Sequence, residues 1–126
     1  MGAPPMRDLP SICPPREGLL VLEPGCGSGK FGLSYALQGA NVTLVDIAPG
    51  VLEYTSALID RLFRHPSVGP KAKRPWLAQG DLQQAEDHCR FQRFDLVLSE
   101  GISHHWPRTD PRRWNSINQM VRVTRL

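Results

Sequence analysis

The stretch from Leu19 to Lys30 constrains this chain more than any other part of its sequence. It reads Leu-Leu-Val-Leu-Glu-Pro-Gly-Cys-Gly-Ser-Gly-Lys, an apolar run that ends in a carboxylate and three alternating glycines. A second apolar run, Asn41–Val45, ends in Asp46. Short apolar runs predict buried parallel strands, and glycines with carboxylates at their carboxyl ends predict a nucleotide pocket at that edge of the sheet.

Strand-type and helix-type patterns alternate along the rest of the chain. The predicted elements are strands at 19–23, 41–45, 76–79 and 94–98, and helices at 28–38, 49–65, 82–89 and from 110 onward. This alternation requires parallel pairing with right-handed crossovers. We therefore expect an α/β fold with a doubly wound, mostly parallel sheet of about four strands. By analogy with other doubly wound sheets, the strand order is expected to be 3-2-1-4.

The chain length of 126 residues predicts one domain. Residues 1–17 contain five prolines, which restrict φ and remove backbone donors, so this leader is expected to be extended or disordered. The remaining residues, 18–126, are expected to form the domain. The segment 66–75 is predicted to be a basic loop that is interrupted by proline and glycine.

Composition narrows the cellular setting. The apolar runs are too short to span a bilayer, and the N-terminus has no apolar segment typical of a secretory signal, so no membrane partner is expected. The three cysteines, Cys13, Cys26 and Cys89, have no spacing that indicates a disulfide framework or a metal site. A reducing cytoplasm is the simplest compartment for such a chain.

Three nucleotide-binding motifs compete for the glycine stretch. A phosphate-binding P-loop is excluded because Gly25 to Gly29 is one residue too short and Phe31 stands where a hydroxyl would hold magnesium. A dinucleotide motif Gly-x-Gly-x-x-Gly begins at Gly27, but it leaves Glu23 unexplained. The third possibility is a loop for a nucleoside ligand that carries an ammonium and a sulfonium. A carboxylate such as Glu23 attracts these positive charges, whereas it repels a pyrophosphate.

From Leu19 to Leu126 the chain resembles the class I S-adenosylmethionine-dependent methyltransferases. The resemblance rests on the glycine stretch, on Asp46, on Gly80-Asp81 after the third strand, and on Ser99-Glu100-Gly101 after the fourth. It implies S-adenosylmethionine as the cofactor and no metal. The residues that it assigns to cofactor binding are Glu23, Gly25, Cys26, Gly27, Gly29, Asp46, Ile47, Asp81, Leu82, Ser99 and Glu100.

The resemblance also implies a role for each acidic side chain. Glu23 serves the methionine ammonium, Asp46 holds both ribose hydroxyls, and Asp81 accepts a bond from the adenine amino group. Ile47 and Leu82 cover the adenine ring. Cys26 is expected to be a small loop residue rather than a nucleophile, because no paired histidine is evident.

The implied reaction is in-line transfer of a methyl group to a small-molecule oxygen, nitrogen or carbon nucleophile. The segment after the fourth strand lacks the Asn/Asp-Pro-Pro-Tyr/Phe motif of exocyclic-amine DNA methyltransferases, so nucleic acid is not expected as a partner. His104 and His105 follow this segment and are candidates for a general base, against the alternative of a packed or solvated pair. Two other functions stay open: a cofactor-binding module without catalysis, and a nicotinamide oxidoreductase.

One departure from the family is the length of the sheet. The family's sheet usually has seven strands, whereas Leu126 follows directly on the helix after the fourth predicted strand. Strand four would then be an exposed edge, which is unstable or attracts a partner. Two explanations stay open: the sequence is truncated before strand five, or a partner or a second copy completes the sheet.

Overall fold

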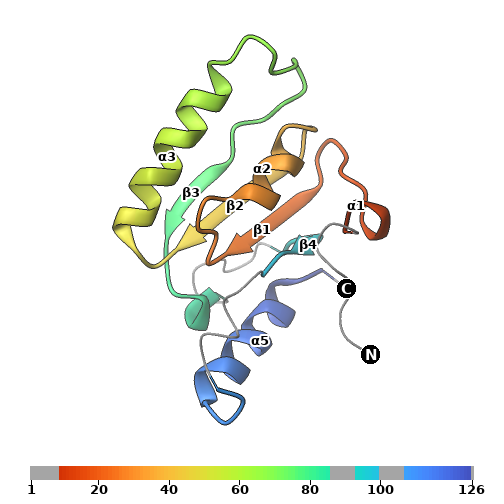
Figure 1. Cartoon of the computed structure of the whole chain (residues 1–126). Coiled ribbons are helices and arrows are strands. Elements are labelled where there is room, and N and C mark those ends of the chain that lie inside the picture. The colour runs from red at the N-terminus through yellow and green to blue at the C-terminus, as the bar shows by residue number, and fades with distance from the viewer. Residues whose placement is uncertain (1–8, 86–92, 100–106, 126) are drawn as a thin grey trace.

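The computed structural model describes residues 9–85, 93–99 and 107–125. Four strands form its sheet, and they are β1 (Leu20–Pro24), β2 (Asn41–Asp46), β3 (Trp76–Gln79) and β4 (Leu96–Val97). The strand order is β3-β2-β1-β4, and every pair is parallel (Figure 1). The structure therefore confirms the predicted α/β class and the predicted strand order.

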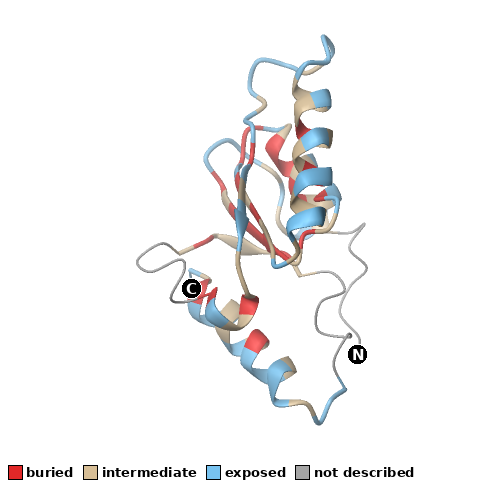
Figure 2. Ribbon diagram, turned by 90° about the vertical axis from the view of Figure 1, so that its left-hand side faces the viewer, coloured by how far each residue is buried: buried red, intermediate tan, exposed pale blue. Residues whose placement is uncertain are grey.

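Helices cover both faces of this sheet. The elements after the strands are α2 (Lys30–Ala36), α3 (Pro49–Phe63), the 3-10 helix η2 (Leu82–Gln84) and α5 (Pro111–Val123). Helices α2 and α3 pack on one face, and η2 and α5 pack on the other. Figure 2 shows that the buried residues gather along the strands and on the helix sides that face them. None of the helices in the described ranges has the length and apolar character needed to cross a membrane.

The continuous apolar run of β1 supplies both cores. Val21 points toward α2 and α3, where it joins Tyr35 and Ile59 in one cluster. Leu22 points to the opposite face, where it joins Phe94 and Val123 in a second cluster. A strand that is covered on both faces must be apolar at successive positions, which explains why no polar alternation interrupts the run before Glu23.

The end of α5 covers the first part of the β4 edge. The Phe94 N–H donates to the Val123 carbonyl at 2.8 Å, and the Arg125 N–H donates to the Phe94 carbonyl at 2.7 Å. Phe94 and Thr124 form a parallel bridge. Strand β4 itself spans only Leu96–Val97, shorter than the predicted 94–98, because Phe94 pairs with this C-terminal segment outside the named strand.

The described part of the leader differs from the expected irregular segment. Residues Leu9–Ile12 form a short helix, α1. Pro10 is tolerated there because the N–H groups of a first helical turn have no intrahelical partner. Leu9 and Cys13 pack on the core beneath α2, and the Tyr35 hydroxyl donates to the Cys13 carbonyl at 2.6 Å. A buried anchor therefore holds the end of the leader.

The third helix region is described only at its start. At the start of the predicted helix 82–89 the structure has a 3-10 helix, Leu82–Gln84, and residues 86–92 lie outside the described residues, so the rest of this helix stays a prediction. Asp81 is the N-cap of this turn, and its side chain accepts from the Gln83 N–H at 2.9 Å. The helix 28–38 is also shorter than predicted and ends at Ala36, because the chain turns through Gly39 at φ 95°.

Candidate functional site

Three loops meet at the carboxyl edge of the sheet. The glycine loop follows β1, Asp46 ends β2 and leads into Ile47-Ala48, and Gly80-Asp81 follows β3. The parallel register aligns Pro24 with Val45, and it aligns Asp46 with Gln79. Side chains after these strands therefore converge, as Figure 1 shows at the tips of the three arrows.

The glycine loop needs glycine for two different reasons. Gly25, Gly27 and Gly29 have φ values of 61°, 53° and 74°, in the left-handed region that other residues rarely adopt. A Cβ on Gly27 would meet no atom of residues 9–85, 93–99 and 107–125 within 4 Å, so no described side chain fills the space in front of this residue. A Cβ on Gly29 would lie 2.8 Å from Leu44 Cδ1. Gly27 thus leaves room for a ligand, and Gly29 lets α2 start close against β2.

Glu23 is buried, with 4% of its surface exposed, and it supports the start of α2. Its Oε1 accepts from the Gly32 N–H at 2.8 Å. The N-cap residue Gly29 has no side chain for this task, so the Glu23 carboxylate satisfies one of the free N–H groups of the first turn. The predicted contact of Glu23 with a ligand ammonium stays a prediction.

Gly32 explains the dinucleotide-like spacing of the glycines. A Cβ on this residue would lie 2.7 Å from Leu44 Cδ2 and 2.8 Å from Glu23 Oε1. The third glycine of the Gly-x-Gly-x-x-Gly pattern is therefore required by close packing of a helix on a strand. This packing requirement holds whichever nucleotide the loop binds.

The carboxylate of Asp46 is oriented by two backbone amides. Its Oδ2 accepts from the Gly27 N–H at 3.3 Å, and its Oδ1 accepts from the Ala48 N–H at 3.0 Å. These two bonds hold the carboxylate beside the glycine loop. An ionised carboxylate has about four lone-pair sites, so two adjacent hydroxyl donors can still be accepted.

Thr55 supports the site although no sequence pattern predicted this role. Its hydroxyl donates to the Gly27 carbonyl at 2.5 Å, and the residue is fully buried on α3. This bond links two residues that are 28 positions apart and ties the glycine loop to the next helix. One signal was available in the sequence: Thr55 lies four residues before Ile59, so this hydroxyl stands on the apolar side of its helix.

A cavity of about 220 Å³ lies beside these loops. Its wall includes Val45, Ala78, Asp81 and Leu82. Leu82 is 5% exposed and forms part of the floor. Ile47 is 62% exposed, and its carbonyl accepts from Gln79 Nε2 at 3.2 Å. The site thus offers an apolar slot with a carboxylate at its rim, an arrangement that suits a planar heterocycle with an amino group.

Cys26 is a structural residue of the loop. Burial, together with the nearby charges of Asp46 and Glu23, raises the pKa of its thiol to about 12. The group is therefore a neutral thiol at physiological pH and a poor nucleophile. Its backbone N–H donates to the Val45 carbonyl at 3.0 Å, which joins the loop to β2.

The segment after β4 is described only in part. Ser99 lies there, and its hydroxyl oxygen is buried without a hydrogen-bond partner among the residues that the structure describes. Glu100, His104 and His105 lie outside the described residues. The structure thus brings together the predicted residues after β1, β2 and β3, and the predicted general bases stay predictions.

Comparisons with known proteins agree with this geometry. Residues 21–125 match the model of the family described as a methyltransferase domain. No curated protein sequence matches the chain. Among solved structures, a magnesium protoporphyrin IX methyltransferase from Synechocystis PCC 6803 with bound SAH matches with a TM-score of 0.69 and 21% identity, over 86% of this chain and 43% of that one.

Two further structures have the same fold. An arsenic(III) S-adenosylmethionine methyltransferase from Chlamydomonas reinhardtii matches with a TM-score of 0.67 and 27% identity, over 87% of this chain and 36% of that one. A TehB-like SAM-dependent methyltransferase from Corynebacterium glutamicum matches with a TM-score of 0.65 and 23% identity, over 94% of this chain and 54% of that one. The chain thus spans about half the length of these proteins or less, and it belongs to the methyltransferase domain family.

Proposed function

We propose that this chain binds S-adenosylmethionine at the carboxyl edge of its sheet, and that it serves methyl transfer to a small-molecule acceptor through an oxygen, nitrogen or carbon nucleophile. The observation that carries the proposal is the Asp46 carboxylate, which the amides of Gly27 and Ala48 orient beside the open space over Gly27. Family membership and the fold of the solved methyltransferases support it.

Each polar group at the edge has a task in this proposal. Asp46 accepts the two ribose hydroxyls, Asp81 accepts a bond from the adenine amino group, and Glu23 attracts the methionine ammonium. Ile47 and Leu82 pack on the two sides of the adenine. The helix start at Lys30 presents free N–H groups toward an anionic carboxylate.

The chemistry is a nucleophilic displacement at carbon. The bound cofactor supplies an electrophilic methyl group on a sulfonium. The residues of this chain contribute position: they hold the nucleoside and the amino acid part of the cofactor, and they direct the methyl group toward the segment after β4. Proximity and alignment of this kind lower a barrier by several kcal/mol, about 7–11 in favourable cases. His104 and His105 stay candidates for the general base that removes a proton from the acceptor.

The nicotinamide alternative has less support. A dinucleotide would bring its diphosphate close to carboxylates at the ends of β1 and β2, where like charges repel. The third glycine of the dinucleotide pattern, Gly32, is explained by packing against Leu44 and Glu23. A cofactor-binding module without catalysis is the second candidate, because the chain spans only part of the solved methyltransferases.

Titration calorimetry with S-adenosylhomocysteine tests the proposal. The wild-type chain is expected to bind this product, and Asp46→Asn is expected to bind at least about tenfold more weakly, since an amide has one acceptor oxygen in place of two. Glu53→Gln removes the same charge from an exposed position on α3 and is expected to leave binding unchanged. Binding of NAD in preference to S-adenosylhomocysteine would contradict the proposal. A transfer assay with labelled cofactor and a metabolite pool separates an enzyme from a binding module.

A further inference from the structure

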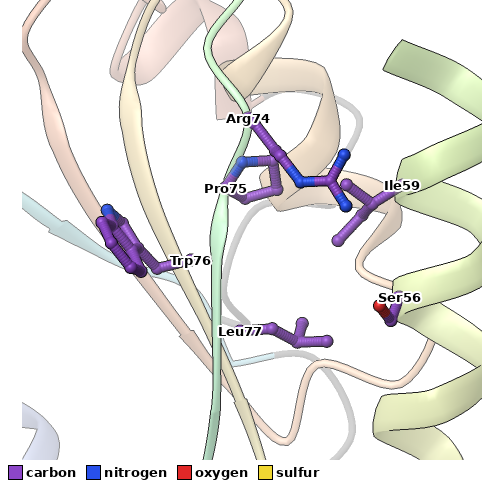
Figure 3. A pocket seen from close by; sticks show the side chains of 6 residues that line it. All are labelled: Ser56, Ile59, Arg74, Pro75, Trp76 and Leu77. Atoms are coloured by element: carbon purple, nitrogen blue, oxygen red, sulfur yellow. The ribbon is translucent and has the colours of Figure 1, made fainter. Parts of the chain in front are cut away.

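A groove runs along the outer edge of β3. It lies between β3 and α3, has a volume of about 400 Å³, and is lined in part by Ser56, Ile59, Arg74 and Leu77. Figure 3 shows Ile59 and Leu77 pointing into the space between the strand and the helix. The floor of the groove is therefore apolar.

The strand beside this groove has unused backbone groups. β3 is the end strand of the described sheet. The Gly80 N–H donates to the Asp46 carbonyl at 3.1 Å, so the backbone groups of alternate residues face β2 and those of Leu77 and Gln79 face outward. Within residues 9–85, 93–99 and 107–125, these outward groups make no hydrogen bond. An edge of this kind can accept another strand.

The rim of the groove is basic. From residue 60 to residue 76 the chain has five lysines and arginines and one acidic residue, Asp60. Asp60 pairs with Arg74, and both side chains are about half exposed. Arg74 lines the groove, and Arg61 in α3, Arg64 directly after α3 and Lys73 before β3 are exposed as well. This end of the molecule therefore attracts anionic groups.

The basic loop has an anchor in the fold. The Lys73 N–H donates to the Ala36 carbonyl at the end of α2 at 2.9 Å. The loop lies at the amino ends of the strands, at the top of Figure 1, whereas the glycine loop lies at their carboxyl ends. The basic loop and the glycine loop therefore lie at opposite ends of the sheet, and Gln79 is the point where the edge of β3 reaches the cavity beside Asp81.

We propose that the edge of β3 binds an extended acidic segment of a partner protein, which adds to the sheet as a strand. The outward N–H and C=O groups of Leu77 and Gln79 pair with its backbone, its apolar side chains enter the groove over Ile59, and its carboxylates face Arg64 and Lys73. A nucleic acid matches the charge but not the apolar floor or the strand edge. Trp76 is one of the residues that line the groove, but its indole, which could stack on a base, lies on the opposite side of β3 from Ile59 (Figure 3).

Binding of model peptides to the full chain tests this inference. The probe is a fluorescein-labelled peptide with five Glu-Val repeats, and the controls have five Lys-Val or five Glu-Pro repeats. The Glu-Pro peptide keeps the charge but has no N–H at its prolines and cannot pair as a strand. We expect the Glu-Val peptide to bind, to protect the amides of Leu77 and Gln79 from hydrogen exchange, and to exceed both controls in affinity by at least about tenfold.

Charge reversals at exposed positions locate the surface without disturbing the core. Arg64→Glu and Lys73→Glu are each expected to weaken Glu-Val binding by about threefold to fivefold, in line with exposed ion pairs. Arg108→Glu, which lies before α5 on the other side of the sheet, is the matched control. S-adenosylhomocysteine binding is expected to be unchanged in all three variants. This outcome separates a failure of the present inference from a failure of the proposed function.

Four results would overturn the inference. One is equal binding of the Glu-Pro and Glu-Val peptides. Another is tighter binding of a ten-nucleotide oligouridylate to the same residues. The third is the absence of any change at Leu77 and Gln79 at millimolar Glu-Val peptide. The fourth is concentration-dependent protection of these amides without peptide, which would show that a second copy covers the edge.

Discussion

The hydroxyl of Thr55 donates to the carbonyl of Gly27 at 2.5 Å, and this bond fastens α3 to the glycine loop. The N–H of Gly27 donates in turn to Asp46, whose other oxygen accepts from Ala48 just before α3. Helix α3 therefore holds both parts of the site. Thr55 in the helix binds the glycine loop, and Ala48 just before the helix binds the Asp46 carboxylate. The geometry of the cofactor site therefore depends on a residue that no ligand needs to contact.

We expect Thr55→Val to weaken S-adenosylhomocysteine binding by about tenfold and to lower the free energy of unfolding by about 1–3 kcal/mol. Valine keeps the shape of threonine but leaves the Gly27 carbonyl without its donor in a buried position. Thr55→Ser keeps the hydroxyl and is expected to retain affinity despite its lost methyl group. Calorimetry and chemical denaturation measure the two quantities. Equal affinity of the valine and serine variants would contradict the role of the hydrogen bond.

Gly32→Ala tests the packing between α2 and β2. Its new Cβ would approach the buried Leu44 side chain at 2.7 Å and the Glu23 carboxylate at 2.8 Å, and both neighbours are held in place. We expect a loss of about 1–3 kcal/mol in the free energy of unfolding, as for other overpacked cores. The matched control is Gly50→Ala in the first turn of α3, where a Cβ meets no atom within 4 Å. The control is expected to be neutral or stabilising by up to about 1 kcal/mol. Urea denaturation measures the free energy of unfolding of both variants, and equal values would contradict the packing role of Gly32.

The thiol of Cys26 is predicted to resist alkylation. A pKa raised from 9.0 to about 12 reduces the thiolate fraction at pH 8 by about a thousandfold, and burial restricts access further. Cys13 is partly exposed and is expected to react with iodoacetamide before Cys26 does. Mass spectrometry of peptides after timed labelling distinguishes the two sites. Labelling of Cys26 at the rate of Cys13 in the folded protein would show that the loop is open.

The same thiol makes stability depend on alkaline pH. Because the folded-state pKa of Cys26 lies above the unfolded value, its contribution to stability is complete below pH 9 and is lost as the pH rises toward 12. Cys26→Ala is expected to show a smaller loss of unfolding free energy between pH 8.5 and 10.5 than the wild type. Urea denaturation at each pH provides the slope. Parallel slopes for the two proteins would contradict the assignment.

Tyr35→Phe tests whether the leader is anchored. Tyr35 is 1% exposed, and its hydroxyl donates to the Cys13 carbonyl. Loss of this bond is expected to cost about 0.5–1.5 kcal/mol and to speed tryptic cleavage at Arg16, since local opening becomes more frequent. Tyr54→Phe removes a hydroxyl from a residue that is 61% exposed and is the control. Equal cleavage rates in the two variants would show that the bond does not hold the leader.

The glycine loop and the acidic residues at the ends of the strands were predictable from the sequence. The sequence alone indicated the α/β class, the parallel order of strands and the convergence of Glu23, Asp46 and Asp81 at one edge. These features follow from local patterns: apolar runs of strand length, glycines that permit positive φ, and carboxylates directly after strands. Each of these patterns lies within about ten residues of sequence, so the elements and the position of the carboxylates can be predicted without knowing which distant residues are in contact.

The partner of each of these groups depends on contacts between separate elements of the fold. Glu23 supports Gly32 at the start of α2, Thr55 holds Gly27 from another helix, and the Tyr35 hydroxyl fixes Cys13 in a leader that was expected to be irregular. The last two contacts join residues that are 28 and 22 positions apart, and a separation of this size leaves no periodic pattern in the sequence. Chemistry along the chain therefore determined where a site could form, and packing between distant elements determined which side chains hold it in shape.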